Sequence, residues 1–244
     1  GKIDVISGTF LGNYASNYTS SYAGAGVGAI YNGGSINNIS GIFISNYAYS
    51  LDGRAMGGAI YNDAYIQNAY IQKIAGNFIS NYTFSRQTSS GGAIANFAII
   101  DSINASFIGN SATSNFAAFG GAIYNEGTIG NKDESGNLVD GIINSSFINN
   151  FARVDNYTAN GGAIYTKADL NIIADNGYSV FSGNYVYDKN GRRPEAIYVS
   201  SKSNTLKLES KNNGIIHFDD QINGAQGYSL TLAGDSSGLI ELNN

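Results

Sequence analysis

Residues 107–125 read FIGNSATSNFAAFGGAIYN and contain both of the short motifs that recur along this chain. The first motif is Phe-x-x-Asn, here Phe107–Asn110, and the second is Gly-Gly-Ala-Ile-Tyr-Asn, here Gly120–Asn125. Six copies of each alternate strictly over residues 10–199, at spacings of 29 to 41 residues. A period of this length, made of short β-prone segments, predicts a solenoid in which each coil stacks on the one before it.

Stacked coils would bring equivalent residues of the two motifs directly above one another. The first motif begins at Phe10, Phe43, Phe78, Phe107, Phe147 and Phe181. The second occupies Gly28–Asn32, Gly57–Asn62, Gly91–Asn96, Gly120–Asn125, Gly161–Thr166 and, in degenerate form, Pro194–Val199. We therefore expect a column of phenylalanines, a column of isoleucines, and two asparagine ladders with amides hydrogen-bonded from coil to coil.

One repeat contains three strand-like segments, namely Gly28–Asn32, Ser35–Ile39 and Gly41–Tyr47, followed by a variable stretch at 48–56. Gly, Asn and Ser bound each segment, as is typical of tight turns. We expect an all-β fold, a parallel β-solenoid of about seven coils of roughly 30 residues with three short strands per coil. Residues 1–244 would form one domain, regular over 1–199, with divergent coils or a cap over 200–244.

Side chains alternate along a strand, so the Ile and the Tyr of the second motif face opposite ways. The isoleucine recurs in all six copies, which favours an inward Ile and an outward Tyr; the opposite orientation is the alternative. An outward aromatic stripe would then consist of Tyr31, Tyr61, Tyr124, Tyr165 and Tyr198, interrupted at Ala95. Such a stripe is a candidate surface for stacking on sugars or for binding protein, unless it only stabilises the sheet.

The composition excludes several classes of protein. Of 244 residues, 43% are hydrophobic and only 13% are charged, which argues against a disordered chain. A net charge of −5 argues against a nucleic-acid partner, because binding phosphates needs an excess of Lys and Arg. There is no cysteine and no apolar run long enough for a membrane helix. The chain begins at Gly1 without a methionine or signal peptide, so we interpret it as a segment of a longer protein.

With these alternating motifs, residues 10–199 resemble the passenger domains of chlamydial polymorphic outer-membrane proteins and related bacterial autotransporters. The resemblance implies a right-handed parallel β-helix, secreted through an outer-membrane barrel and displayed on the bacterial surface as an adhesin. The barrel would follow this segment and tether it to the outer membrane. Because the family motifs are structural repeats, the resemblance brings no catalytic residue with it.

Parallel β-helices also host polysaccharide hydrolases and lyases, so the sequence must be searched for paired carboxylates about 5–10 Å apart. Asp63 and Glu126 share a position in the repeat, but a whole coil separates them. Asp4 and Asp101 share another position, three coils apart. The single histidine, His217, has no nucleophile marked beside it. We expect no catalytic residue and no cofactor.

Two loops are further candidates for binding. The longest insertion, between Glu126 and Asp140, carries Lys132, Asp133 and Glu134. It lacks the spacing of a known calcium loop, so we expect no metal there. A second loop, at 188–193, carries Arg192 and Arg193 and could dock an anionic glycan; plain solvation of these charges is the alternative.

The leading hypothesis is a non-enzymatic adhesin segment on the bacterial surface, with a host-cell surface protein or glycan as its partner. A carbohydrate-active enzyme is the first alternative, to be distinguished by a cleft with clustered carboxylates. A self-associating structural stalk is the second, to be distinguished by concentration-dependent sedimentation.

Overall fold

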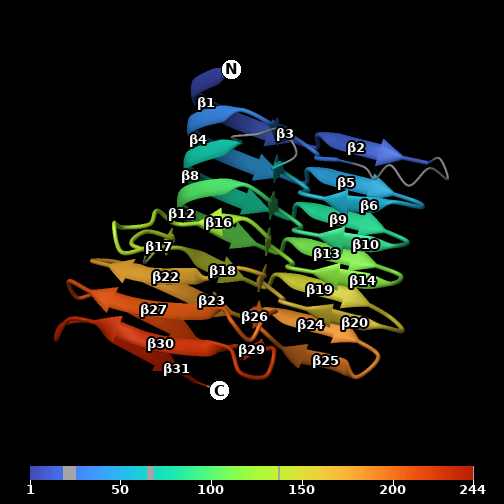
Figure 1. The fold of residues 1–244 in the computed structure, drawn as a ribbon. Coiled ribbons are helices and arrows are strands. Elements are labelled where there is room, and N and C mark those ends of the chain that lie inside the picture. The colour runs from blue at the N-terminus through green and yellow to red at the C-terminus, as the bar shows by residue number, and fades with distance from the viewer. Residues whose placement is uncertain (19–25, 65–68, 137, 244) are drawn as a thin grey trace.

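The computed structural model describes residues 1–18, 26–64, 69–136 and 138–243. Every described element is a β-strand, and the strands wind into a parallel solenoid of about six turns at a spacing of about 33 residues (Figure 1). The predicted all-β solenoid is confirmed, and the number of turns is close to the predicted seven. No helix occurs in the described ranges, and so none that could span a membrane.

Four sheets, here named A to D, run along the solenoid. Sheet A consists of β1 (Lys2–Leu11), β4 (Ser35–Ile44), β8 (Tyr70–Ile79), β12 (Ile99–Ile108), β16 (Thr128–Ile129), β17 (Ile142–Ile143), β18 (Ser146–Ile148), β22 (Leu170–Asp175), β23 (Tyr178–Ser182), β27 (Thr205–Lys211), β28 (Ile215–Phe218), β30 (Ser229–Gly234) and β31 (Leu239–Leu242). Sheet B consists of β2 (Tyr14–Asn17), β5 (Tyr47–Ser50), β9 (Tyr82–Ser85), β13 (Ser111–Ser114), β19 (Phe151–Val154), β24 (Tyr185–Asp188) and β25 (Gly191–Pro194).

Sheets C and D are made of three-residue strands. Sheet C consists of β6 (Arg54–Met56), β10 (Thr88–Ser90), β14 (Ala117–Phe119) and β20 (Thr158–Asn160). Sheet D consists of β3 (Ile30–Asn32), β7 (Ile60–Asn62), β11 (Ile94–Asn96), β15 (Ile123–Asn125), β21 (Ile164–Thr166), β26 (Ile197–Val199) and β29 (Ile222–Gly224). A central coil therefore visits D, A, B and C in turn before it returns to D.

The prediction of three short strands per coil is wrong, because a central coil has four strands. The expected strands Ser35–Ile39 and Gly41–Tyr47 merge into one ten-residue strand, β4, which bends at Gly41. Gly41 has a φ of 144°, which only glycine adopts readily, and its backbone packs against that of Gly8. The stretch at 48–56, expected to be variable loop, instead contains most of β5 and all of β6.

The coil has two lobes, which Figure 1 shows side by side. Sheets A and D enclose the main lobe, whose core is built from large apolar side chains such as Ile39, Phe43 and Ile60. Sheets B and C enclose a thinner lobe, here called the wing, whose core is built from small side chains such as Ala112, Ala118 and Ala152. The predicted phenylalanine column forms in the main lobe, with ring centroids 4.2–4.9 Å apart, and extends one coil further to Phe218.

Both repeated motifs lie at the neck between the lobes, where the chain leaves the main lobe and returns to it. The second glycine of each Gly-Gly pair lies directly against the start of the sheet B strand of its own coil, where the chain leaves the main lobe. A Cβ on Gly121 would lie 2.5 Å from the backbone N of Phe151 and still closer to the backbone oxygen of Gly162. The glycine is needed because two backbone segments meet there without room for a side chain.

The asparagines of the first motif complete the neck as a buried ladder. The side-chain amide of Asn46 donates to Oδ1 of Asn81 at 2.9 Å and to the backbone oxygen of Phe10 at 2.9 Å. Its own Oδ1 accepts from the backbone N of Asn13 at 3.0 Å. The same pattern continues through Asn110, Asn150 and Asn184. The second predicted ladder also forms, from Asn32 through Asn62, Asn96 and Asn125 to Oγ1 of Thr166.

The motifs end where the wing ends. After β24 the chain turns back as an antiparallel strand, β25, so sheet C receives no further strand. Glu195 then occupies the position of the second glycine, and its carboxylate accepts a hydrogen bond from the backbone N of Gly161 at 2.5 Å. In the next coil the chain passes from β28 to β29 through only Asp219, Asp220 and Gln221. A coil without a wing has no neck, and so needs neither motif.

Candidate functional site

The predicted isoleucine orientation is confirmed, because the isoleucines of sheet D point into the core of the main lobe. The tyrosines beside them leave that core but do not form an open stripe. Tyr31 is 50% exposed, whereas Tyr124 is 5% and Tyr165 is 8% exposed. Tyr61 and Tyr198 are half-buried. The expectation that Tyr124 and Tyr165 face solvent is therefore wrong.

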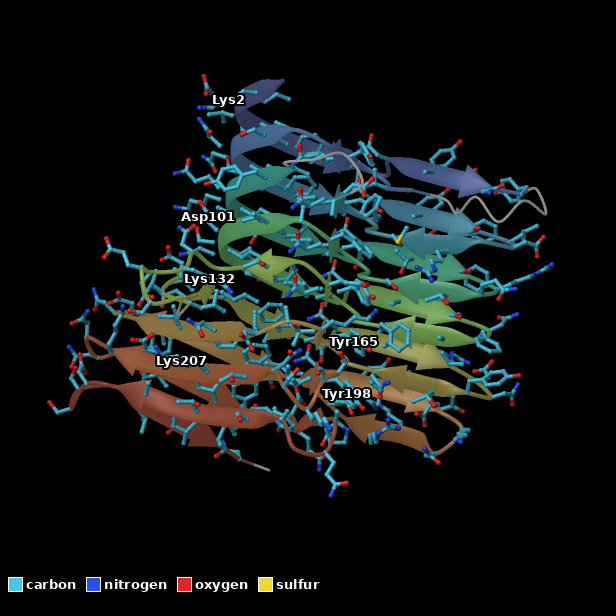
Figure 2. The ribbon with its side chains drawn as sticks, in the orientation of Figure 1. Lys2, Asp101, Lys132, Tyr165, Tyr198 and Lys207 are labelled. Carbon is cyan, nitrogen blue, oxygen red and sulfur yellow. The ribbon has the colours of Figure 1, made fainter. Side chains whose placement is uncertain are left out.

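The wing buries these tyrosines. Sheets C and D meet at a corner, and Phe119 on β14 lies 4.7 Å from the ring of Tyr165 and 6.4 Å from that of Tyr124. Figure 2 shows Tyr165 and Tyr198 in this central position between the lobes. The interruption at Ala95 is filled by Phe97, whose ring lies 5.5 Å from Tyr61 and 5.4 Å from Tyr124.

Carboxylates of the same corner bind the hydroxyls of Tyr31, Tyr61 and Tyr124. Tyr31 donates to Asp63 at 2.6 Å and Tyr124 donates to Glu126 at 2.6 Å. Burial raises the pKa of Tyr124, and the hydrogen bond to Glu126 raises it further. Burial alone would raise the pKa of Glu126, but the bonds from Tyr124 and Lys167 outweigh it and lower that pKa. Asp63 and Glu126 therefore stabilise separate tyrosines and do not work as a pair.

The insertion at 130–141 joins β16 to β17 and projects from the outer side of the main lobe (Figure 1). Lys132 forms an antiparallel bridge with Leu138, and Asp133 accepts a hydrogen bond from the backbone N of Ser135 at 2.9 Å. Lys132, Asp133 and Glu134 are exposed at the tip of this turn. The structure thus presents these three predicted binding residues together, on a loop braced by its own hydrogen bonds.

A groove flanks the insertion on each side. The first has a volume of about 610 Å³ and lies between the insertion and the strands β22, β27 and β30. Its lining includes Asp133, Val139, Asn171, Lys207 and Glu209. The second has a volume of about 540 Å³ and runs across β1, β4, β8 and β12. Lys132 lies between Asp101 of the second groove and Lys207 of the first in Figure 2.

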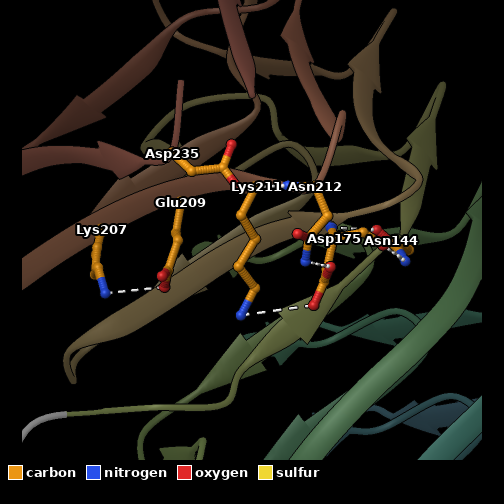
Figure 3. A network of polar contacts seen from close by, with 7 residues as sticks. All are labelled: Asn144, Asp175, Lys207, Glu209, Lys211, Asn212 and Asp235. Atoms are coloured by element: carbon orange, nitrogen blue, oxygen red, sulfur yellow. Dashed lines mark hydrogen bonds and ion pairs between the residues drawn. The ribbon is translucent and has the colours of Figure 1, made fainter. Parts of the chain in front are cut away.

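The rim of the first groove is held by a polar network (Figure 3). Lys207 pairs with Glu209 at 2.9 Å, and Lys211 pairs with Asp175 at 3.6 Å. Asn212 donates its side-chain amide to the same Asp175 at 2.7 Å. These charges are partly exposed and offer donors and acceptors side by side, an arrangement suited to the hydroxyls of a sugar or to a polar peptide.

The second groove contains the carboxylates that the sequence aligned at one position. Asp4 accepts a hydrogen bond from Asn37 at 2.9 Å, and Asp101 accepts one from the hydroxyl of Tyr70. The register of the strands places Asn37 and Gln72 between them along sheet A. Burial and the bond to Asp101 raise the pKa of Tyr70 to about 12. The groove is therefore a row of amides and carboxylates across successive coils.

The predicted loop at 188–193 is the turn of the β24–β25 hairpin. Arg193 pairs with the buried carboxylate of Asp188 at 2.9 Å and donates to the backbone oxygen of Ala159 at 3.3 Å. The guanidinium of Arg192 lies 4.1 Å from the ring centroid of Tyr185. Both arginines thus hold the hairpin that closes the wing.

His217 bridges the last two coils on the outer face of sheet A. Its Nδ1 lies 2.8 Å from Glu241 and its Nε2 lies 2.8 Å from Asp219. The hydrogen bond to Glu241, and then that to Asp219, raise the pKa of His217. Among the described residues there is no group of three or more His, Cys, Asp or Glu that could hold a metal ion.

This bridge makes the last coil sensitive to pH. A histidine whose pKa is raised on folding contributes stability that is complete below its unfolded value of about 6.5. That contribution is lost as the pH rises through the folded pKa. We expect amide hydrogen exchange in β31 to be slower at pH 6 than at pH 8.5, after correction for intrinsic rates. His217→Gln should remove the difference, and an unchanged difference in that variant would contradict the assignment.

Sequence reasoning missed two aromatic columns on the outer face of sheet B. One column there consists of Tyr14, Tyr47, Tyr82, Ser111, Phe151 and Tyr185, and a second contains Tyr49, Phe84, Thr113, Arg153 and Tyr187. The rings stack at 4.8–5.2 Å. The signal was available, because five of the six Phe-x-x-Asn motifs are followed directly by Tyr or Phe.

Ser111 is the one residue after a Phe-x-x-Asn motif that is not aromatic. We therefore expect an aromatic substitution at this position to stabilise the fold. Ser111→Tyr would place a ring between those of Tyr82 and Phe151 and make the stack continuous. Stacked aromatic pairs contribute about 0.5–1.5 kcal/mol each beyond burial, so we expect the free energy of unfolding to rise by about 1 kcal/mol. Urea denaturation followed by circular dichroism measures this, and a decrease in stability would show that the column does not accept a ring here.

The comparisons with known proteins agree with this repeat structure. Neither the curated proteins nor the solved structures gave a significant match. A family model for the Chlamydia polymorphic membrane protein repeat matches residues 144–167, which run from the end of β17 through one complete passage of the wing to β21. The segment contains one Phe-x-x-Asn and one Gly-Gly-Ala-Ile motif, so the resemblance that the two motifs indicated is confirmed: the chain carries a repeat of the Chlamydia polymorphic membrane protein type.

Proposed function

We propose that this chain is a surface-exposed, outer-membrane-associated passenger segment that attaches a bacterium to host cells or matrix without enzymatic activity. The repeat match supports the surface location, because the family model describes proteins of the Chlamydia membrane. Secretion through and tethering by a C-terminal barrel belong to the same proposal. The partner is a host-cell surface protein or glycan.

The observation that carries the attachment role is the insertion at 130–141. It is the largest departure from the regular repeat spacing, and it displays Lys132, Asp133 and Glu134 between two polar grooves. A loop held on a rigid scaffold is where binding residues most often lie. The grooves offer a volume of the size that binding sites usually have, and mixed donors and acceptors to fix a ligand's orientation.

The corner tyrosines contribute less to this proposal than their sequence pattern indicated. Tyr124 and Tyr165 are buried against Phe119, so little of either side chain is accessible to a partner. Tyr31 is open to solvent, but its hydroxyl is already bound by Asp63. The corner therefore serves mainly to join the wing to the main lobe.

Binding of the fluorescently labelled chain to epithelial cells and immobilised mucin, measured by flow cytometry and surface plasmon resonance, tests the proposal. The test variant changes Lys132, Asp133 and Glu134 to Ser. The control changes Arg86, Asp155 and Lys189, three exposed charged residues of the wing tip, to Ser. We expect saturable binding that falls at least tenfold in the test variant and stays within twofold in the control.

Two outcomes would contradict this assignment. Equal loss in both triple variants would mean that general surface charge drives attachment, not the insertion. Absence of saturable binding by the unmodified chain would leave it as a stalk, and sedimentation at increasing concentration would then show whether copies associate.

A further inference from the structure

The two aromatic columns on the outer face of sheet B share a gap at the same coil. Ser111 stands in the first column between Tyr82 and Phe151, and Thr113 stands in the second between Phe84 and Arg153. Above and below this coil the rings stack on one another, at 4.8 Å for Tyr47–Tyr82 and 5.1 Å for Phe151–Tyr185. The coil of β13 therefore lacks a layer that its neighbours have.

The missing layer defines a slot of specific height. Rings two strands apart lie roughly 10 Å apart, twice the spacing of neighbouring strands. That separation is twice the spacing of the rest of the column, so the position of one ring is missing between Tyr82 and Phe151. The slot is two side chains wide, because Ser111 and Thr113 lie two residues apart on the same face of β13.

The walls and the floor of this slot differ in chemistry. Around Ser111 the walls are aromatic, with Tyr82 on one side and Phe151 on the other, whereas Thr113 has Phe84 on one side and Arg153 on the other. The floor is polar, and neither hydroxyl of Ser111 or Thr113 is hydrogen-bonded to any described residue. Ser111 and Thr113 are partly exposed and Tyr82 is 36% exposed, so this position is accessible to solvent.

We propose that this slot binds one pyranose ring of a glycan, inserted edge-on between Tyr82 and Phe151. Both faces of a pyranose carry C–H groups that pack on aromatic rings, while its equatorial hydroxyls lie around the rim. An edge-on pyranose therefore directs hydroxyls toward Ser111 and Thr113 and C–H groups toward the two walls.

An aromatic side chain from a protein partner fits the same height but not the same floor. Its rim consists mainly of C–H groups, which would cover the hydroxyls of Ser111 and Thr113 without satisfying them. Covering a polar group without a partner costs about 1–3 kcal/mol. The polar floor therefore favours a sugar over an aromatic residue.

Saturation-transfer difference NMR with the 244-residue chain tests this site. The probes are the methyl pyranosides of glucose, galactose, mannose and N-acetylglucosamine, with N-acetyltyrosinamide as the aromatic competitor. We expect transfer from the protein to the ring C–H protons of at least one pyranoside. Ser111→Tyr fills the slot and should abolish that transfer, while its unfolding curve shows that the fold is kept.

Two further variants test where the site lies and what its floor contributes. Tyr14→Ser removes an exposed ring from the same column, three coils above the gap, and should leave the transfer unchanged. Ser111→Ala keeps the slot but removes a floor hydroxyl, and should weaken binding by threefold or more. Equal loss in Tyr14→Ser and Ser111→Tyr would assign the binding to exposed rings in general and overturn the slot.

Other results would also overturn the proposal. Transfer that persists in Ser111→Tyr would place the sugar elsewhere. Transfer to N-acetyltyrosinamide alone, lost in Ser111→Tyr, would replace the glycan by an aromatic side chain of a protein. No transfer to any pyranoside from the unmodified chain would reject the sugar assignment. Because the slot lies on the wing and the insertion lies on the main lobe, failure here leaves the insertion variant's result intact.

Discussion

Gly121→Ala is expected to lower the free energy of unfolding by about 4 kcal/mol or more, an effect at the extreme of single substitutions. The added Cβ would lie 2.5 Å from the backbone N and O of Phe151 and closer still to the backbone oxygen of Gly162. All three atoms belong to backbone, so none can move aside as the end of a flexible side chain does. The chain must open its neck, which separates the wing from the main lobe in that coil.

Urea denaturation followed by far-UV circular dichroism measures this effect on the whole chain. Gly26→Ala is the matched control, because a Cβ there meets nothing within 4 Å and the residue has no positive φ. We expect the control to stay within about 0.5 kcal/mol of the unmodified chain. A loss below 1 kcal/mol in Gly121→Ala would show that the two backbone segments of the neck do not require glycine.

The stacked columns could be predicted from the sequence because a solenoid repeats its contacts. Residues at one position of the repeat must lie above one another. The correct period was therefore enough to place Phe43, Ile60 and Asn62 in their columns. The unusual spacing between Ala122 and Ala163 likewise located the insertion. No knowledge of the path of the chain within a coil was necessary for either inference.

The wing could not be predicted in this way. Its core uses small side chains such as Ala48, Ala55 and Ala112, which give little hydrophobic alternation in strands of three or four residues. The burial of Tyr124 and Tyr165 depends on Phe119, which belongs to a strand that the sequence did not indicate. The role of Arg193 depends on β25 turning back antiparallel, the exception in an otherwise parallel pattern.

This geometry also explains what the two motifs have in common. Each marks one of the two crossings of the neck, so they occur together as long as the wing exists. Glu195 and Asp220 lie where the neck ends. Both are buried carboxylates that accept hydrogen bonds from the preceding coil. Burial raises the pKa of each of these two groups. Loss of the paired motifs in a sequence of this type therefore predicts the end of the wing.

Asn110→Leu is expected to lower the free energy of unfolding by roughly 3–6 kcal/mol, because it breaks the ladder at its centre. Oδ1 of Asn110 accepts from the backbone N and the side-chain amide of Asn81, both at 3.0 Å, and its own amide donates to the oxygen of Phe78 at 2.8 Å. All of these groups lie where water does not reach. Leucine of similar size fills the space, but it removes the hydrogen-bond partner of two donors and of two acceptors, the second acceptor being Oδ1 of Asn150. Asn115→Leu, on an exposed turn, is the control and should change stability by less than about 0.5 kcal/mol.

Aspartate at the same position distinguishes hydrogen bonding from packing. Asp220 already ends the ladder by accepting from the backbone N and the amide of Asn184, both at 2.8 Å. A carboxylate can therefore accept the hydrogen bonds that an asparagine of the ladder accepts. It cannot replace the two that Asn110 donates: Asn110→Asp would leave the oxygen of Phe78 without its donor and would place a carboxylate against Oδ1 of Asn150. We expect Asn110→Asp to cost several kcal/mol at pH 7, and Asp220→Asn less than about 1 kcal/mol, in the same denaturation experiment. Equal losses of stability in the two variants would mean that an internal asparagine need not donate. Unequal losses are expected only if each internal asparagine of the ladder must both accept and donate.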